Sequence, residues 1–226
     1  MSVLLVTACA DTGPVYPTSD TLDPWVIAPD SVTPGSDRAP HVAGERMIFR
    51  LAPGERRSSL STGRDWGVWQ NYLMGFDVRV APGQAPAQPV TLARFLRRGD
   101  PETELVAVML DARRGITVLG RSCVPAARLG DWHSVELRIR LADNDTGFLE
   151  IFCDRRPIWA QDGFRTTLPP TCRHGEGCAT PVPRPARFEW QVGLVSPGRV
   201  ARAIRVEMQR IFHHRLFVIP NRVGTL

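Results

Sequence analysis

The sequence predicts an all-β protein, a sandwich of two antiparallel sheets of the jelly-roll type. Three observations indicate this fold: many short runs alternate apolar and polar residues, turn signals separate these runs, and few stretches have helical spacing. The chain has 226 residues and is 43% hydrophobic. Such a chain can bury one sizeable core, and β-sandwiches often reach about 200–250 residues as one domain. We therefore expect a single folded domain over residues 43–226.

The first predicted strands are 45–51, 71–80 and 90–96, and the second of these places Tyr72, Met74 and Phe76 on one parity. Further strands are expected at 105–110, 115–119, 134–141 and 147–153. The turn signals between them are A-P-G-Q, R-R-G-D-P, A-R-R-G and A-D-N-D-T-G. Within 134–141, apolar residues alternate with Glu136, Arg138 and Arg140, which is typical of a strand buried on one face.

The C-terminal third contains a strand at 188–195, preceded by a long polar, proline-rich loop insert at 161–185. Residues 202–218 fit two patterns. Apolar residues recur with period 2 at its start, and with helical spacing over its whole length. Because the remainder is β, we expect a strand pair or one long bent strand.

The N-terminus resembles the end of a bacterial lipoprotein signal. Residues 1–8 are apolar and end in small residues before Cys9, which would be lipidated. The run lacks a basic start and is shorter than a normal signal, so either its start lies upstream or the match is accidental. Because residues 9–42 are rich in Pro, Ser, Thr, Asp and Gly, we expect them to form a tether or extended arm. The protein is then exported and lipid-anchored to the bacterial cell envelope, at the outer membrane.

Four cysteines follow Cys9, and in an exported protein an even number suggests disulfides, with three pairings formally open. We expect Cys172–Cys178, which would close a short loop, and Cys123–Cys153. The short loop contains His174 and Glu176, but this spacing matches no standard zinc pattern. We expect a solvated loop closed by a disulfide, with no metal and no cofactor.

The net charge of +5 comes from arginine alone, because the sequence contains no lysine. Arginine matches carboxylate, sulfate and phosphate groups, so an anionic partner is one explanation. The base composition of the gene is the other. No run of about 20 apolar residues predicts a membrane span. No nucleic-acid-binding motif is present either, so we expect no nucleic-acid partner.

Several segments together resemble the jelly-roll polysaccharide lyases, such as heparin lyase I, glucuronan lyase and alginate lyase, which have a concanavalin-like fold. The segments are R-S-S-L at 57–60, V-T-L-A-R-F-L at 90–96, G-D-W-H-S-V-E-L-R-I-R followed by A-D-N-D-T-G-F-L-E-I-F, and W-Q-V-G-L-V at 190–195. The resemblance covers about residues 45–218. Its most specific part, the third segment, is a core element in the family. It therefore says more about fold than about catalysis.

Lyases of this family cleave uronate polysaccharides by β-elimination. Donors neutralise the substrate carboxylate, a base takes the C5 proton and an acid protonates the leaving oxygen. The family supplies these groups from the motifs R-x-E-L, Q-x-H and K-x-G-x-Y. The resemblance matches Arg57 to the first arginine, Arg94 to the glutamine and Gln191 to the lysine. Ser59, Leu96 and Val195 stand at the glutamate, histidine and tyrosine positions. Charge-neutralising donors are kept, and the proton-transfer groups are replaced.

Other residues are weaker candidates. Tyr72, His213 and His214 carry groups that could transfer protons, although packing toward the core is the commoner role for Tyr72 and an exposed or core-edge position is commoner for a histidine. Trp69 and Asn71 precede or begin a strand expected to border the groove. Tryptophan faces stack on sugar rings, but core packing explains most tryptophans as well.

Two classes of function follow. The first is a lyase-like protein that binds, and in the catalytic version cleaves, an acidic uronate-containing polysaccharide through Arg57, Arg94, Gln191, Asn71 and Trp69. The second is a non-catalytic envelope or assembly lipoprotein whose jelly roll binds another protein. The replaced acid and base favour binding over turnover, while the resemblance favours turnover.

Overall fold

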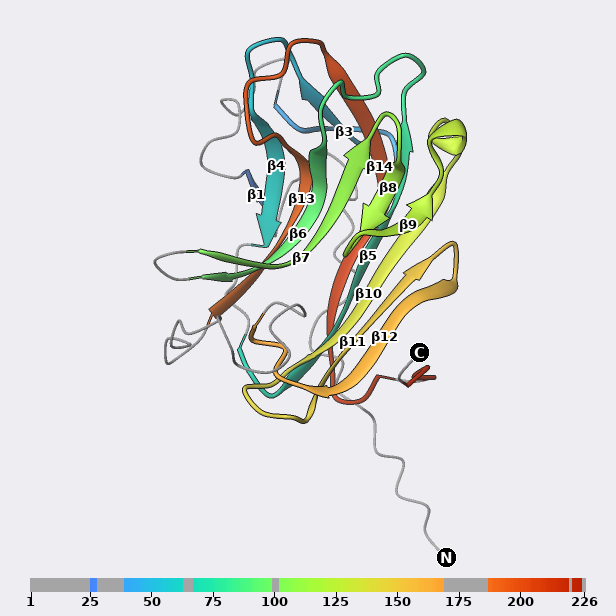
Figure 1. Ribbon diagram of the computed structural model, residues 1–226. Coiled ribbons are helices and arrows are strands. Elements are labelled where there is room, and N and C mark those ends of the chain that lie inside the picture. The colour runs from blue at the N-terminus through green and yellow to red at the C-terminus, as the bar shows by residue number, and fades with distance from the viewer. Residues whose placement is uncertain are drawn as a thin grey trace, which may run out of the picture.

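The structure is a computed structural model that describes residues 25–27, 39–62, 67–98, 102–168, 187–219 and 221–224. These residues form two antiparallel sheets packed face to face, as Figure 1 shows. The sandwich of two antiparallel sheets predicted from the alternation is therefore confirmed. No helix in the described part of the chain is both long and apolar enough to cross a membrane.

Sheet A contains strands from both halves of the sequence. In spatial order its strands are β1 (Trp25–Ile27), β4 (Arg57–Thr62), β13 (Arg187–Val195), β6 (Val90–Arg98), β7 (Thr103–Asp111), β8 (Gly115–Val118) and β9 (Arg121–Val124). Strand β13 lies between β4 and β6, so residues almost a hundred positions apart in sequence become lateral neighbours. Figure 1 shows β6 and β7 turning away from sheet B at their lower ends. This bend makes the outer face of sheet A concave.

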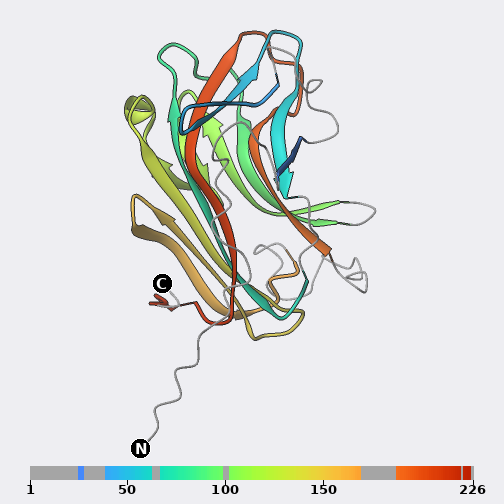
Figure 2. The same cartoon turned by 180° about the vertical axis from the view of Figure 1, so that it is seen from behind.

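Sheet B is built around the two longest strands of the described chain. In spatial order its strands are β12 (Arg156–Phe164), β11 (Gly147–Cys153), β10 (His133–Leu141), β5 (Gln70–Val80), β14 (Ile204–Leu216), β3 (Arg46–Leu51) and β2 (His41–Ala43). In β10 buried and half-buried residues alternate throughout, as the sequence predicted. Figure 2 shows β14 crossing the whole length of this sheet.

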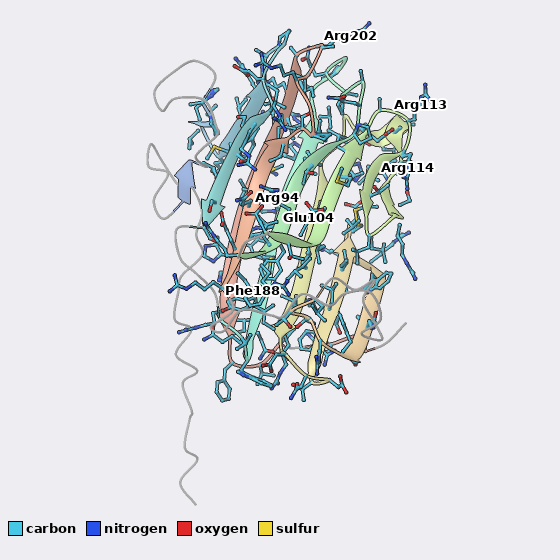
Figure 3. The ribbon with its side chains drawn as sticks, turned by 60° about the vertical axis from the view of Figure 1, so that its left-hand side comes forward. Arg94, Glu104, Arg113, Arg114, Phe188 and Arg202 are labelled. Atoms are coloured by element: carbon cyan, nitrogen blue, oxygen red, sulfur yellow. A yellow bond between two sulfur atoms is a disulfide. The ribbon has the colours of Figure 1, made fainter. Side chains whose placement is uncertain are left out.

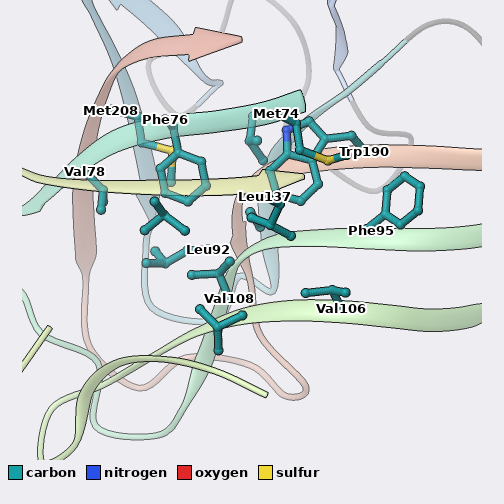
Figure 4. Packing of buried hydrophobic residues seen from close by; sticks show 14 of the residues in the cluster. Met74, Phe76, Val78, Leu92, Phe95, Val106, Val108, Leu137, Trp190 and Met208 are labelled. Atoms are coloured by element: carbon teal, nitrogen blue, oxygen red, sulfur yellow. The ribbon is translucent and has the colours of Figure 1, made fainter. Parts of the chain in front are cut away.

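The core lies between the two sheets and consists of their inward-facing side chains. Figure 4 shows Phe76 of β5 close to Trp190 of β13, and their ring centroids are 6.3 Å apart. This contact joins sheet B to sheet A, because the two strands belong to different sheets. Burying a large aromatic side chain contributes about 1.5–3 kcal/mol, so such pairs dominate the cohesion of the sandwich. Alternation then forces the neighbours of Trp190, which are Glu189 and Gln191, to the outer face of sheet A.

Several boundaries differ from the sequence prediction. Strand β12 continues to Phe164, so the prediction of a loop from residue 161 is wrong at its start. Strands β1 and β2 lie within the segment predicted as a tether, because residues 25–27 pair with β4 and residues 41–43 pair with β3. Strands β4, β9 and β12 were not predicted. Residues 204–216 form one strand with an irregularity between Gln209 and Phe212, which confirms the long bent strand rather than the strand pair.

Candidate functional site on the outer face of sheet A

The outer face of sheet A carries a row of polar side chains set by strand register. Ser61 of β4 is paired with Gln191 of β13, and Gln191 is paired with Arg94 of β6. One row further along, Glu189 is paired with Leu96, and Leu96 with Glu104 of β7. Sequence reasoning found Arg94 and Gln191 but missed the acidic residues in the second row. The alternation E-W-Q in β13 carried the signal, because a buried Trp190 places both of its neighbours on the opposite face.

Arg94 is held between an amide and a carboxylate. Its Nε donates to Gln191 Oε1 at 2.8 Å, and its Nη1 lies 3.5 Å from Glu102 Oε1. Figure 3 shows Arg94 and Glu104 next to each other on this face. Only 14% of the Arg94 side chain is exposed, whereas 44% of Glu102 is. The guanidinium is therefore held by two partners, and its carboxylate partner is the more exposed member of the pair.

Glu189 is the most deeply buried charged group of this face, with 2% exposure. Its Oε1 accepts hydrogen bonds from the Ser61 hydroxyl and from Gln191 Nε2, the latter at 2.8 Å. Its Oε2 forms an ion pair with Arg98. Burying a carboxylate is costly unless it is paired and hydrogen-bonded, and these three partners meet that requirement. Glu189 thereby orients Gln191, which in turn orients Arg94.

Glu104 is the described carboxyl of this face whose pKa is raised. Although Glu104 is exposed as a residue, desolvation by its surroundings raises the pKa of its carboxyl, Arg94 opposes this by lowering it, and Glu102 raises it further. A carboxyl with a raised pKa next to an arginine is a combination found at functional sites, although structural networks produce it too. Glu104 is the group on this face closest in character to a proton acceptor.

The remaining motif positions lie on β4, β13 and β6. Arg57 is paired with Val195, four residues along β4 from Ser61, which is about 13 Å along an extended strand. Leu96, at the position matched to histidine, is fully buried between Glu189 and Glu104. In the described residues, no histidine or tyrosine belongs to sheet A. The face thus combines arginine and amide donors with carboxylates.

The predicted proton-transfer residues Tyr72, His213 and His214 all lie on sheet B. Tyr72 is packed inside with 2% exposure, and burial raises its pKa to about 12. His213 is buried beside Met74, and the ring of His214 stacks on Phe212 with centroids 5.6 Å apart. The structure does not bring any of them to Arg94.

Trp69 and Asn71 are also separated from Arg94. They line a pocket of about 510 Å³ at the end of sheet B where β5 begins and β10 and β14 end. The prediction that they border the same groove as Arg94, Arg57 and Gln191 is wrong, because β5 pairs with β10 and β14 rather than with any strand of sheet A. The outer faces of the two sheets point in opposite directions.

A smaller pocket of about 240 Å³ includes His133, Ser134 and Asp154. His133 Nδ1 lies 2.8 Å from Asp154 Oδ2, and its Nε2 lies 2.9 Å from the Arg128 carbonyl oxygen. Both ring nitrogens are engaged, so the imidazole has no free atom for a substrate. Burial raises the pKa of Asp154, but the hydrogen bonds from His133 and from the Ser134 N–H outweigh it and lower the pKa. His133 and Asp154 are a structural pair.

The predicted disulfide between Cys123 and Cys153 is present and connects β9 of sheet A to β11 of sheet B. Cys9, Cys172 and Cys178 lie outside the described residues. Among the residues that the structure describes, no group of three or more His, Cys, Asp or Glu side chains could hold a metal ion.

Comparison with known proteins finds similarity of structure only. The sequence matches no protein-family model and no curated protein. The chain is similar to the endo-β-1,4-glucuronan lyase of the fungus Trichoderma reesei, with 15% identity, coverage of 94% of this chain and 93% of that chain, and a TM-score of 0.56. It is similar to alginate lyase A1-II′ of polysaccharide lyase family 7, with 12% identity, coverage of 81% and 85%, and a TM-score of 0.55.

A third similar structure is the alginate lyase of Corynebacterium sp., with 10% identity, coverage of 81% and 84%, and a TM-score of 0.53. At these identities the comparisons show the fold. The chain is a divergent jelly roll built like those of glucuronan lyase and family 7 alginate lyases.

Proposed function

We propose that this protein binds an acidic, uronate-containing polysaccharide along the outer face of sheet A. The observation that carries the proposal is the Arg94–Gln191 pair, in which a buried amide holds a partly exposed guanidinium on the outer face of sheet A. The fold supports it, since glucuronan and alginate lyases share the same two-sheet architecture. In the bound state a uronate carboxylate takes the place of Glu102 on Arg94, forming a charge-assisted hydrogen bond.

Binding without turnover is the version that the residues favour. β-Elimination requires a base at C5 and an acid at the leaving oxygen, and Leu96 and Val195 can supply neither. Among the described groups near Arg94, Glu104 is the carboxyl whose pKa is raised. The proposed role of this face is therefore to hold the sugar, with Arg94 as the contact to its carboxylate and Gln191 as the residue that orients Arg94.

The proposal is tested by titrating the protein with alginate, glucuronan and heparin oligosaccharides. Binding should weaken as salt rises, because exposed charges are screened. Arg94→Ala should weaken it about tenfold or more, the value of a lost charged hydrogen bond. Glu102→Gln should strengthen it about two- to fivefold, because it removes the competing carboxylate. Asp131→Asn is the matched control, since it changes the net charge equally on an exposed side chain outside sheet A.

The same samples measure turnover by the ultraviolet absorbance of the unsaturated uronate product. A flat absorbance together with salt-sensitive binding supports the proposal, whereas a rise would make the protein a lyase. If the affinity changes neither with salt concentration nor in Arg94→Ala, the outer face of sheet A is not the binding face.

A second candidate is a non-catalytic envelope or assembly lipoprotein whose jelly roll binds another protein. It is favoured by the small exposed fraction of Arg94 and by its existing pairing with Glu102. In that case none of the three acidic glycans binds, with or without salt.

We also propose that the protein is exported and lipid-anchored at Cys9 in the outer membrane. The Cys123–Cys153 disulfide supports export, because such bonds persist in oxidising compartments. Radiolabelled palmitate should be incorporated by the full precursor and not by Cys9→Ser. Labelling of both the wild-type precursor and Cys9→Ser, or of neither, would contradict a lipid anchor at Cys9.

A further inference from the structure

A pocket lies on sheet B, away from the proposed polysaccharide-binding face. It has a volume of about 510 Å³ and occupies the end of the sheet where Leu216, Asn71 and Arg140 align in one row. Figure 1 shows the start of β5 and the ends of β10 and β14 meeting in this region. A pocket of this size accommodates a small ligand or one or two sugar units.

The charge of the pocket is positive. Arg140 and Arg215 line it, and none of its described lining residues is acidic. A pocket lined by one sign of charge concentrates ligands of the opposite sign. It therefore selects an anion, and the planar arginine forks match a carboxylate best when two donors converge on it.

The pocket also contains a donor and an acceptor that lack partners. Arg140 Nε and Asn71 Oδ1 are both buried without a hydrogen-bond partner in the described structure. Buried polar atoms are nearly always paired, so each such atom in a pocket requires a partner that a water molecule or a bound group would supply. The other end of the Asn71 amide is fixed, because its Nδ2 donates to the Phe217 carbonyl at 2.8 Å. The site thus offers a donor to an anion and an acceptor to a hydroxyl.

Aromatic rings border the pocket. Trp69 is 50% exposed, and Phe217 is 93% exposed. Trp69 has a φ of 66°, a conformation that bulky residues rarely adopt, and its N–H donates to the Leu141 carbonyl at 2.6 Å. A strained backbone that holds a large ring at the surface is typical of a binding site, because strain persists where function requires it. The flat faces of such rings stack on sugars.

From these features we infer that the pocket is a second, independent binding site for an acidic sugar. Arg140 and Arg215 bind the carboxylate, Asn71 Oδ1 accepts from a ring hydroxyl, and Trp69 packs against the sugar ring. The inference rests on the ligand class of the proposed function but on none of its residues. The protein would then hold one acidic chain at two places, or two chains at once.

The experiment uses the full chain and a glucuronan tetrasaccharide, with binding followed by calorimetry and by tryptophan fluorescence. Two sites per chain are expected. Arg140→Gln and Trp69→Ala should each weaken one site about tenfold or more and leave the second unchanged. Arg94→Ala should weaken only the other site. Arg156→Gln is the matched control, because it removes the same charge from an exposed position outside the pocket.

The outcomes separate the two proposals. If Arg140→Gln and Trp69→Ala change neither affinity nor stoichiometry while Arg94→Ala abolishes binding, the second site is refuted and the proposed function stands. If Arg94→Ala changes neither affinity nor stoichiometry while Arg140→Gln and Trp69→Ala abolish binding, the second site stands and the proposed function fails. A neutral cellotetraose should not bind. Inorganic sulfate that binds this pocket as tightly as the tetrasaccharide, with no effect of Trp69→Ala, would reduce it to a simple anion site and overturn the inference.

Discussion

On the outer face of sheet A, individual residues act on one another through a chain of contacts. Glu189 accepts from Gln191, Gln191 accepts from Arg94, and Arg94 also contacts Glu102. Because Arg98 and Arg94 oppose three carboxylates here, the charge of the face depends on how many of these carboxyls are ionised. Glu104 is the one whose pKa is raised, first by burial and then by Glu102. The charge around Arg94 therefore changes as the pH falls.

A raised carboxyl pKa predicts a specific dependence of stability on pH. The folded state binds the Glu104 proton more tightly than the unfolded state, whose pKa is near 4.5. Between that value and the raised pKa the folded state carries more protons, so the free energy of unfolding falls as the pH rises. The free energy of unfolding of the wild-type protein, minus that of Glu104→Gln, should therefore fall as the pH rises from about 4.5 to about 7. Urea unfolding of both proteins across this range measures the difference.

Asp111 is the matched control on the same strand. Hydrogen bonds from the N–H groups of Arg114 and Arg113 lower its pKa, with burial opposing them. The stability that the ionised Asp111 carboxylate contributes is fully present above its unfolded-state pKa of 3.8. It is lost as the pH falls through the lower pKa of the folded state. The stability difference between wild type and Asp111→Asn should stay constant over the range in which the Glu104 difference changes. A constant Glu104 difference would show that its pKa is not raised.

The irregularities in sheet A give its strands their curvature. Register shifts occur in β13 between Val192 and Val195, and in the β6–β7 pair at two places. Bulges bend a strand and increase its twist, which turns the outer face into a concave surface. Gly193 lies within the β13 irregularity at a φ of 119°. A Cβ there would lie 2.5 Å from the Ser58 carbonyl oxygen and 2.6 Å from the ring of Phe49.

Gly193→Ala should therefore destabilise the protein strongly. The clash with Ser58 involves backbone that cannot rotate away, and the φ is unfavourable for any side chain, so we expect a loss of about 2–4 kcal/mol in the free energy of unfolding. Gly54→Ala separates the two causes, since its φ of 89° is also positive but nothing lies within 4 Å of the added Cβ. It should cost about 1–3 kcal/mol at most. Equal losses in the two variants would show that the close approach of β13 to β4 contributes nothing.

For the whole molecule, the sequence predicted the layers better than the sites. Alternation in β10 and the parity of β5 report burial on one face directly, so the two-sheet sandwich followed from them. The short serine-rich strand β4 gave no such signal, because its serines are buried by neighbouring elements rather than by their own hydrophobicity. The pairing of β13 with β4 and β6 decides which residues share a face, and that pairing is not encoded in local pattern. Trp69 and Asn71 were therefore grouped with Arg94, although they lie on the other sheet.

The two sheets are joined covalently as well as by the core. The Cys123–Cys153 bridge connects β9, at the edge of sheet A, to β11 in sheet B across 30 residues of sequence. Cross-linking a loop of this length limits the unfolded chain and stabilises a protein by about 2–4 kcal/mol. The double variant Cys123→Ala/Cys153→Ala should lose that amount in urea unfolding. It should still bind acidic oligosaccharide below its transition, because neither cysteine lies on the outer face that carries Arg94.

Reductant provides the control for this prediction. Dithiothreitol should lower the stability of the wild-type protein toward that of the double variant, and any further loss that reductant causes in the variant belongs to other cysteines. If the variant is as stable as the oxidised wild type, the aromatic contact between Phe76 and Trp190 and the surrounding core suffice to hold the sheets together. The bridge would then protect only the edge strand β9, and its loss should appear as local opening in hydrogen exchange at β8 and β9 rather than as global unfolding.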